Sequence, residues 1–302
     1  MRSCIVFKSG FIAIIGRPNV GKSTLMNHVI GEKIAITTPK PQTTRNRIMG
    51  IFNRDDGQFI FIDTPGIHQA FTPLNKLMVD TAVRTFGSTD ILLLLMDAEK
   101  GIQEADRKLI ESLKETPLPI ILGMNKIDLI KKDLLLPMID ELRQLGRFEG
   151  IIPLSAIEGR GIDILLDEIW KRLPEGPFLF PEDMMTDRTE RFIAAEVIRE
   201  KVILLTHQEI PYATAVVIDT FQENKDNRRH IRIEATITVE KESQKGILIG
   251  RKGTMLKRIG SLARTDLEIF FASRIFLKLF VRVRKGWTQN KRMLKEFGYT
   301  EE

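Results

Sequence analysis

The sequence has a single cysteine, Cys4, among 302 residues, and this excludes a disulfide framework and a cysteine-based metal cluster. Its longest uninterrupted apolar run, from Ile91 to Met96, is far shorter than the ~20 residues that cross a bilayer. The first residues also lack the apolar core and small-residue cleavage site of a secretory signal. We therefore expect a cytosolic protein.

The overall composition is that of a soluble globular protein, with 43% hydrophobic and 28% charged residues. Such a balance excludes a disordered chain, a collagen-like chain and a small disulfide scaffold. The length allows one large domain or two domains of ordinary size.

The charge is unevenly distributed along the chain, whose net charge is +6. Residues 184–302 carry 23 basic and 16 acidic side chains, whereas residues 1–183 carry 23 and 24. Within 245–295, 14 basic residues accompany only Asp266 and Glu268. This excess favours a polyanionic partner, either nucleic acid or an anionic membrane surface, although a solvated basic face without a partner has the same composition.

Apolar strand-like runs alternate with amphipathic helical stretches in the first part of the chain. The strand-like runs are 11–15, 59–63, 91–97, 118–124 and 151–154, and the helical stretches are 72–86, 104–114, 133–145, 161–172 and one beginning near Lys22. Apolar strands alternating with helices predict an α/β domain over residues 1–174, with a mostly parallel sheet and helices on both of its faces.

The pattern changes after this domain. The stretch 174–187 has three prolines and no periodicity, so we place a linker at 175–187. The elements expected beyond it are a helix at 189–205, strands at 213–222 and 229–240, a helix–turn–helix at 243–271, a strand at 275–284 and a short terminal helix. This order predicts a smaller α+β domain over residues 188–302.

The strand expected at 275–284 alternates in polarity. Leu277, Leu279, Val281 and Val283 would face the core, and Lys278, Phe280, Arg282 and Arg284 would share the other face. The basic side chains of that second face are also typical of an edge strand protected by charge.

A phosphate-binding loop is predicted at residues 16–23, which fit the pattern G-x-x-x-x-G-K-[ST] between a strand and a helix. Its glycines allow the backbone amides to surround phosphate oxygens, and the following helix adds its positive dipole end. Lys22 would supply charge to the β- and γ-phosphates, and the Ser23 hydroxyl would bind Mg²⁺. The predicted nucleotide-binding residues here are Gly16, Arg17, Pro18, Asn19, Val20, Gly21, Lys22, Ser23 and Thr24.

A second phosphate-facing motif, Asp63-Thr64-Pro65-Gly66, ends the strand at 59–63. The acid can hold Mg²⁺ through water, and the amide of Gly66 can donate a hydrogen bond to a γ-phosphate. All four residues are therefore predicted to bind nucleotide, although D-x-x-G alone could also be a β-turn.

Two later loops favour guanine over adenine. The carboxylate of Asp128 can accept hydrogen bonds from the N1–H and the exocyclic amine of guanine, which adenine does not present. Lys126 can cover the base, Asn125 can tie its loop to the phosphate loop, and a backbone N–H of Ser155 or Ala156 can meet the guanine carbonyl. Each motif follows a predicted strand, where the ligand crevice of such sheets lies. The sequence therefore favours GTP over ATP.

Together these motifs resemble those of the translation-factor-related GTPases, and residues 40–45 (KPQTTR) are similar to switch I of the Era-type GTPases. The resemblance implies that Thr44, with Thr43 as the alternative, binds Mg²⁺ in the GTP state; from the sequence alone, both could belong to a polar loop. The predicted magnesium ligands are Ser23, Thr44 and Asp63, and the predicted catalytic residues are Lys22, Thr44 and Gly66.

The position after D-x-x-G is Ile67, where many GTPases have a glutamine that orients the attacking water. An apolar side chain cannot do this, so we expect slow intrinsic hydrolysis. The chain resembles GTPases with a hydrophobic residue at this position. In some of these, the asparagine that matches Asn19 helps to bind K⁺. Asn19 is therefore a candidate K⁺ ligand beside the expected cofactor Mg²⁺, and equally a residue that caps the turn.

The basic part of the chain has its own motif, Gly250-Arg251-Lys252-Gly253, between two helical stretches. Two glycines let a loop approach a sugar–phosphate backbone, and the two basic residues supply charge, as in the KH loop that holds about four nucleotides of single-stranded RNA. The expected α-β-β-α-α-β order is that of a type II KH domain. The predicted RNA-binding residues are Ile247, Gly250, Arg251, Lys252, Gly253, Lys257 and Arg258.

With this domain included, the resemblance to the Era-type GTPases covers nearly the whole chain. That family implies GTP and GDP as ligands, a role in assembling the small (30S) ribosomal subunit, and binding of single-stranded RNA near the 3′ end of 16S ribosomal RNA. It also implies peripheral association with the inner face of the cell membrane, which nothing in this sequence requires. We expect a monomer.

Three functional hypotheses remain open at this point. In the first, GTP orders residues 36–46 and 63–75 and thereby changes RNA binding. In the second, the chain is an RNA-binding module whose GTPase half is structural. In the third, it is a membrane-surface GTPase whose basic domain binds anionic lipid.

Overall fold

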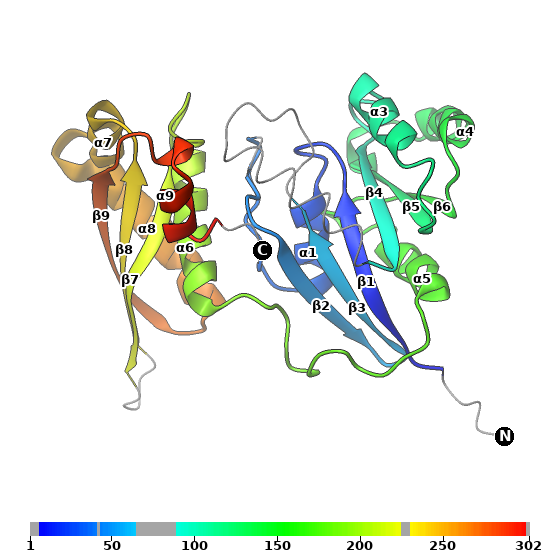
Figure 1. The fold of residues 1–302 in the computed structure, drawn as a ribbon, viewed down its shortest axis with the longest axis horizontal. Coiled ribbons are helices and arrows are strands. Elements are labelled where there is room, and N and C mark those ends of the chain that lie inside the picture. Colours follow the sequence, from blue (N-terminus) through cyan, green and yellow to red (C-terminus); the bar gives the residue numbers. More distant parts are fainter. Residues whose placement is uncertain (1–5, 41–42, 65–88, 225–229, 300–302) are drawn as a thin grey trace. The chain divides into compact units, whose positions relative to one another are not determined.

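The computed structural model describes residues 6–40, 43–64, 89–224 and 230–299. These residues form two compact units (Figure 1). The first contains residues 6–34, 44–64 and 89–187, and the second contains 35–40, 43, 188–224 and 230–299. Pro41, Gln42, Pro65, Gly66, Ile67 and the helix expected at 72–86 lie outside the described residues.

The first unit is built on a six-stranded sheet in the order β2-β3-β1-β4-β5-β6. Its strands are β1 (Lys8–Ile15), β2 (Ile48–Arg54), β3 (Gly57–Asp63), β4 (Ile91–Asp97), β5 (Ile120–Asn125) and β6 (Gly150–Pro153). All neighbouring strands run parallel except β2 and β3, which are antiparallel. This mostly parallel sheet confirms the predicted fold class.

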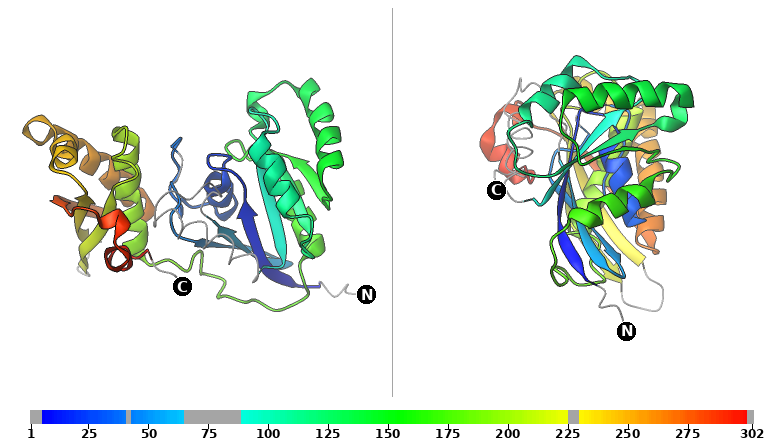
Figure 2. Two further views of the ribbon diagram at one scale, coloured as in Figure 1. Left: turned by 45° about the horizontal axis from the view of Figure 1, so that its top comes forward. Right: turned by 90° about the vertical axis from the view of Figure 1, so that its right-hand side faces the viewer.

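Helices cover both faces of this sheet (Figure 2). They are α1 (Lys22–Ile30), α3 (Glu104–Ser112), α4 (Leu135–Leu145) and α5 (Ile162–Arg172), with short 3₁₀ turns at Ile127–Leu129 and Lys132–Leu134. Ala13 and Ile15 of β1 belong to a buried cluster with α3 and α4, whereas their neighbours Ile12 and Ile14 are buried outside that cluster. Alternate residues of a strand point to opposite faces, so β1 is covered on both sides.

Strand β2 was not predicted from the sequence. It pairs antiparallel with β3 through a tight connection at Asp55 and Asp56, so the two strands form a hairpin at the sheet edge. Its residues Ile48–Arg54 change from apolar to polar along the strand instead of forming one apolar run. A strand at an edge needs less buried surface than a central one, and this weakens its signal in the sequence.

The predicted linker has no helix or strand of its own, and it lies along the first unit. The Gln58 side chain donates to the carbonyl of Phe180 (2.9 Å) and accepts from the backbone amides of Leu179 and Phe180. The backbone amide of Ile51 donates to the carbonyl of Met185 at 2.9 Å. These contacts associate the stretch 175–187 with β2 and β3, while the exact domain boundary stays a prediction.

The second unit has the predicted α-β-β-α-α-β order. Its elements are α6 (Glu190–Leu205), β7 (Ala215–Asn224), β8 (His230–Val239), α7 (Glu242–Ile249), a 3₁₀ turn (Arg251–Gly253), α8 (Thr254–Phe270), β9 (Arg274–Val283), a second 3₁₀ turn (Trp287–Gln289) and α9 (Lys291–Glu296). The strands form a sheet in the order β7-β8-β9, in which β8 pairs antiparallel with β7 and parallel with β9.

The core of the second unit lies between one face of this sheet and helices α6, α7 and α8. Its buried residues include Val197 of α6, Ile233 of β8, Leu248 of α7 and Ile259 of α8. The alternation predicted for β9 is confirmed from Leu277 to Val283: Leu277, Leu279, Val281 and Val283 pack against this core, and Lys278, Phe280 and Arg282 are exposed. Arg284 lies beyond the end of the strand, is half-buried and pairs with Glu296 at 2.7 Å. No helix among the described residues has the length and apolar character needed to cross a membrane.

Candidate functional site

The phosphate loop connects β1 to α1 at the carboxyl end of the sheet, where two glycines are required by geometry. Gly16 has φ +147°, and a Cβ there would lie 2.4 Å from the carbonyl oxygen of Leu95. Gly21 has φ +101°, and its Cβ would lie 2.2 Å from Nδ2 of Asn125. Any side chain at these two positions would therefore displace backbone or a buried amide.

Lys22 is buried within this loop, with 6% of its surface exposed. Its Nζ donates to the carbonyls of Gly16 (3.1 Å) and Arg17 (3.0 Å). Burial lowers the pKa of Lys22 to about 8, and the charge of Asp63 opposes that shift. A buried ammonium at the start of a helix, held by carbonyls of the phosphate loop, is suited to bind the phosphates of a nucleotide.

The three predicted magnesium ligands are brought together. The Ser23 hydroxyl donates to Asp63 Oδ2 at 2.5 Å, and Thr44 Oγ1 lies 3.0 Å from Ser23 Oγ and 3.4 Å from Asp63 Oδ2. Asp63 is fully buried, and its Oδ1 has no hydrogen-bond partner in the described part of the chain. Burial raises the pKa of Asp63, against the lowering effects of Lys22, Ser23 and Thr44.

Such a cluster of hydroxyl and carboxylate oxygens fits Mg²⁺, which prefers hard oxygen ligands. When bound, Mg²⁺ neutralises charge on the phosphates. The alternative ligand Thr43 has its hydroxyl elsewhere: it donates to the carbonyl of Lys40 at 2.7 Å and lies 2.6 Å from Thr38 Oγ1. The geometry thus favours Thr44 over Thr43.

Other residues of the two phosphate motifs have structural contacts of their own. Arg17 Nε pairs with Asp106 Oδ1 of α3 at 2.7 Å, and the Thr64 hydroxyl donates to the carbonyl of Ile14 at 2.9 Å. Asn19 adopts a left-handed backbone, with φ 64°, as a turn residue does. Side-chain contacts of these residues with nucleotide or K⁺ stay predictions.

Asn125 ties three loops together from the end of β5. It is 2% exposed; its Nδ2 donates to the carbonyl of Val20 (2.8 Å), and its Oδ1 accepts from the backbone amide of Ala156 (2.9 Å). In the next turn, Oδ1 of Asp128 is buried and has no hydrogen-bond partner among the described residues. A buried carboxylate oxygen without a partner is suited to accept hydrogen bonds from the N–H groups of a guanine edge.

Lys126 is positioned by an acid that the sequence interpretation missed. Its backbone is left-handed, with φ 67°, and its Nζ lies 2.6 Å from Oδ2 of Asp97. Asp97, which is 1% exposed, also accepts from the amides of Glu99 and Lys100. It ends β4 as Asp63 ends β3, and this repeated strand-end acid was the available signal.

The amides predicted to meet the guanine carbonyl have acceptors within the protein. The backbone amide of Ser155 donates to the carbonyl of Arg160 at 2.9 Å, and that of Ala156 donates to Asn125 Oδ1. Their contact with a base therefore stays a prediction.

The switch-like segment that precedes Thr44 belongs to the second unit, where it contacts α6 and the residue after it. The Lys40 ammonium donates to the carbonyls of Ile203 and Thr206, and the backbone amide of Thr37 donates to Glu200 Oε1 at 3.0 Å. Desolvation lowers the pKa of Lys40.

One further contact holds the end of this segment. Arg199, which is 1% exposed, forms two hydrogen bonds to Glu196, at 2.7 and 2.6 Å, and donates to the carbonyl of Thr43. Neither Arg199 nor Glu196 was predicted, because no local motif marks the contact of Arg199 with Thr43, 156 residues earlier in the chain.

The G-x-x-G loop joins α7 to α8 with the geometry expected of its residue types. Gly250 has φ 71°, and a Cβ there would lie 2.9 Å from the backbone nitrogen of Met255. Gly253 has φ 78° and Lys252 has φ 50°. The exposed members of the predicted RNA site are Ile247, Arg251, Lys252, Lys257 and Arg258. Basic side chains thus surround a backbone that a ligand can approach.

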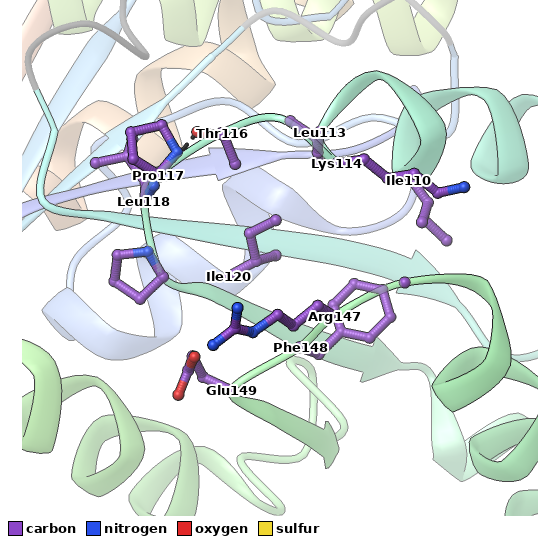
Figure 3. A pocket seen from close by; sticks show the side chains of 12 residues that line it. Ile110, Leu113, Lys114, Thr116, Pro117, Leu118, Ile120, Arg147, Phe148 and Glu149 are labelled. Atoms are coloured by element: carbon purple, nitrogen blue, oxygen red, sulfur yellow. Dashed lines mark hydrogen bonds between the residues drawn. The ribbon is translucent and has the colours of Figure 1, made fainter.

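A cavity of about 300 Å³ lies at the other end of the first sheet (Figure 3). It is bordered by the end of α3, the loop before β5 and the residues before β6, and includes Lys114, Arg147, Phe148 and Glu149. The cavity residues lie at or before the starts of β5 and β6. The predicted nucleotide-binding residues lie at or after the ends of β1, β3, β5 and β6, at the opposite edge of the sheet. The cavity is therefore separate from the candidate nucleotide site.

Two family models match the chain: "50S ribosome-binding GTPase" over residues 11–126 and "KH domain" over residues 209–288. The GTPase Era of Syntrophus aciditrophicus is 65% identical over 98% of this chain and 97% of its own length. That of Geobacter metallireducens is 52% identical over 97% of this chain and 98% of its own length.

Two solved structures of Era proteins are also similar over 98% of this chain and the whole of theirs, at 39% identity. One is an Aquifex aeolicus Era variant bound to GDP·AlF₄⁻, with a TM-score of 0.94. The other is Era in complex with MgGDPNP and nucleotides 1506–1542 of 16S ribosomal RNA, with a TM-score of 0.93. This chain belongs to the GTPase Era family and is a GTPase with a carboxyl-terminal KH domain.

Proposed function

We propose that this GTPase is a switch that binds single-stranded RNA near the 3′ end of 16S ribosomal RNA and assists assembly of the small (30S) ribosomal subunit. One observation carries the proposal: a guanine-nucleotide site and an exposed basic G-x-x-G loop occur in one chain. That chain is similar along 98% of its length to an Era solved with MgGDPNP and nucleotides 1506–1542.

The nucleotide half of the proposal is supported by three groups of side chains. Lys22 supplies charge to the phosphates, the oxygens of Ser23, Thr44 and Asp63 would hold Mg²⁺, and the free acceptor of Asp128 meets the guanine edge. The first two groups act on the phosphates of GTP, and the third acts on its base.

Hydrolysis is expected to be slow in the isolated protein. Ile67 stands where a water-orienting glutamine would be, so the residues named here stabilise phosphate charge without positioning water. We assign Asn19 as the candidate ligand of a K⁺ ion beside the phosphates, which would add positive charge where the leaving phosphates need it.

The RNA half rests on the exposed loop of the second unit. Gly250 and Gly253 allow close approach of a sugar–phosphate backbone, and Arg251, Lys252, Lys257 and Arg258 present positive charge around it. This combination is suited to about four unpaired nucleotides.

Coupling between the nucleotide site and the KH domain is supported by two adjacent residues that contact one part each. Thr43 and Thr44 are consecutive: the Thr43 carbonyl accepts from Arg199 of α6, and the Thr44 hydroxyl lies beside Ser23 and Asp63. A shift of Thr44 toward a nucleotide-bound Mg²⁺ would therefore act on the contacts of α6, a helix of the KH domain.

The proposal is tested by crosslinking the GTP-analogue-loaded protein to RNA in cells and sequencing the bound fragments. We expect enrichment of the 3′ end of 16S ribosomal RNA, lost in the Arg251→Asp/Lys252→Asp variant. Enrichment of unrelated RNA, or none, would contradict the RNA assignment.

Two control measurements separate the competing functions. Lys22→Ala should abolish function in cells after its folding is verified, whereas a purely structural GTPase half predicts unchanged function. Stronger binding to anionic vesicles than to RNA at matched salt would favour the membrane-surface hypothesis.

A further inference from the structure

The sheet of the second unit has one face that no helix of the core covers. Helices α6, α7 and α8 pack on the other face, so the side chains of β9 that point away from the core meet solvent. In order along β9, these are Arg274, Phe276, Lys278, Phe280 and Arg282. We call these residues, together with Arg232 of β8, the open face.

Two phenylalanines on the open face are unusually exposed for their size. Phe276 is 61% exposed and Phe280 is 41% exposed. Aromatic rings normally stabilise a fold by being buried, so their position on an uncovered strand provides little folding energy. Two such rings on one strand suggest contact with a ligand.

Cations alternate with these rings. The Arg232 guanidinium lies 5.7 Å from the centre of the Phe276 ring, and the Lys278 ammonium lies 4.8 Å from that of Phe280. No acidic side chain occurs on β9 itself, and Glu234, the acid opposite Lys278 on β8, is paired with Arg232 at 2.5 Å. The open face therefore complements an anionic partner that also carries flat apolar surfaces.

Unpaired RNA has both properties. Its bases stack on exposed aromatic rings, and its phosphates pair with neighbouring cations, in proteins that bind single strands over a sheet surface. A lipid surface would share the anionic charge but would gain nothing specific from aromatic rings compared with aliphatic ones.

We infer that the open face is a second RNA-binding surface, on which unpaired bases stack over Phe276 and Phe280 while phosphates contact Arg274, Lys278 and Arg282. The inference rests on the proposed RNA-binding function and extends it beyond the G-x-x-G loop. That loop joins the helices on the covered side of the sheet, so the two surfaces contact different nucleotides of one RNA.

The spacing of the rings fits separate bases. Phe276 and Phe280 are four residues apart on one strand, or about 13 Å at the usual rise of a strand. This is far more than the ~3.4 Å between stacked bases, so each ring takes its own base with Lys278 between them. Because β9 is an edge strand, the RNA can pass around it from the covered side to the open face.

The test measures binding of the full chain, loaded with a GTP analogue and Mg²⁺, to the RNA segment 1506–1542 by fluorescence anisotropy. Phe276→Leu/Phe280→Leu keeps apolar side chains but removes the ring faces, and Phe276→Trp/Phe280→Trp keeps ring faces. Ile269→Ala, at a residue of α8 that is 76% exposed, controls for loss of any exposed apolar group. Thermal melting verifies that each variant folds.

We expect the double leucine variant to bind this RNA about tenfold or more weakly, in the lower part of the range for losing base–aromatic stacks. The double tryptophan variant and Ile269→Ala should bind like the unmodified chain. Ultraviolet crosslinking should map RNA to the peptide containing Phe276 and Phe280.

Equal affinity of the double leucine variant and the unmodified chain, with weakened binding by Arg251→Asp/Lys252→Asp, would overturn the second surface and leave the proposed function intact. Binding of the unmodified chain to anionic vesicles that is weakened in Lys278→Asp/Arg282→Asp, with RNA affinity unchanged in that variant, would overturn it in favour of a lipid surface. Failure of the unmodified chain to bind the RNA would overturn both proposals.

Discussion

The buried ammonium of Lys22 predicts that nucleotide binding takes up a proton at alkaline pH. Burial lowers the pKa of Lys22 from 10.5 to about 8 in the ligand-free protein. The phosphates of GTP or GDP would bring negative charge to this ammonium and raise its pKa again. Protonated lysine is therefore the form that binds, and above pH 8 its protonation must accompany binding.

The lowered pKa of Lys22 sets the size of the proton uptake and of the change in nucleotide affinity. At pH 8.5, roughly one quarter of the ligand-free protein would have Lys22 protonated, so binding takes up about 0.8 proton and affinity falls about fourfold relative to pH 7. At pH 7 the lysine is already protonated, and its contribution to proton uptake is close to zero.

The stability of the ligand-free protein should rise with pH, whereas its affinity for nucleotide falls. The unfolded chain holds a proton on Lys22 up to its ordinary pKa near 10.5, and the folded chain releases it near 8. The destabilisation is fully present below pH 8, amounts to about 3 kcal/mol, and is relieved as the pH rises from 8 to 10.5.

Isothermal titration calorimetry of GDP binding measures this uptake directly, in pairs of buffers with different ionisation heats at pH 7 and 8.5. Lys22→Arg is the matched control, because a guanidinium stays charged at both values. A proton uptake at pH 8.5 no larger than that of Lys22→Arg would refute the reasoning about the buried ammonium.

Three further predictions follow from particular contacts. Gly21→Ala should lower GTP affinity by tenfold or more, because its Cβ would lie 2.2 Å from Nδ2 of Asn125; unchanged affinity in a nucleotide titration would contradict this. GTP turnover should be faster in K⁺ than in Na⁺ buffer and should lose that difference in Asn19→Ala, whereas equal rates in both salts would remove the potassium role. Arg199→Ala should lower the free energy of unfolding by about 3–5 kcal/mol, because it leaves the buried Glu196 without its partner. Chemical denaturation measures that change, and a loss below 1 kcal/mol would argue against a structural role for the pair.

The parts of the fold that could be predicted are those with local signals. The phosphate loop was located because its residue types and spacing fix a turn between a strand and a helix, and the apolar runs of β1, β3, β4 and β5 mark a buried sheet. Strand β2 was missed because Ile48–Arg54 is partly polar and lies at an edge, where tertiary pairing with β3 decides its conformation.

The candidate site likewise contains residues that a local motif marks and residues that only the fold reveals. Ser23, Thr44 and Asp63 were assigned from motifs far apart in the chain, and the structure brings their oxygens together. Arg199 could not be assigned, because its long-range contact with the Thr43 carbonyl is created only by the fold. Asp97 had a signal in its place at the end of a strand, but that signal does not identify Lys126 as its partner. A charged residue without a motif has no sequence signal for its partner.

One set of affinities decides whether the guanine nucleotide controls RNA binding. The dissociation constant for the RNA segment 1506–1542 should be measured with Mg²⁺ and a non-hydrolysable GTP analogue, with GDP, and without nucleotide. We expect tighter binding with the analogue than in the other two states. Equal dissociation constants in all three states would contradict it.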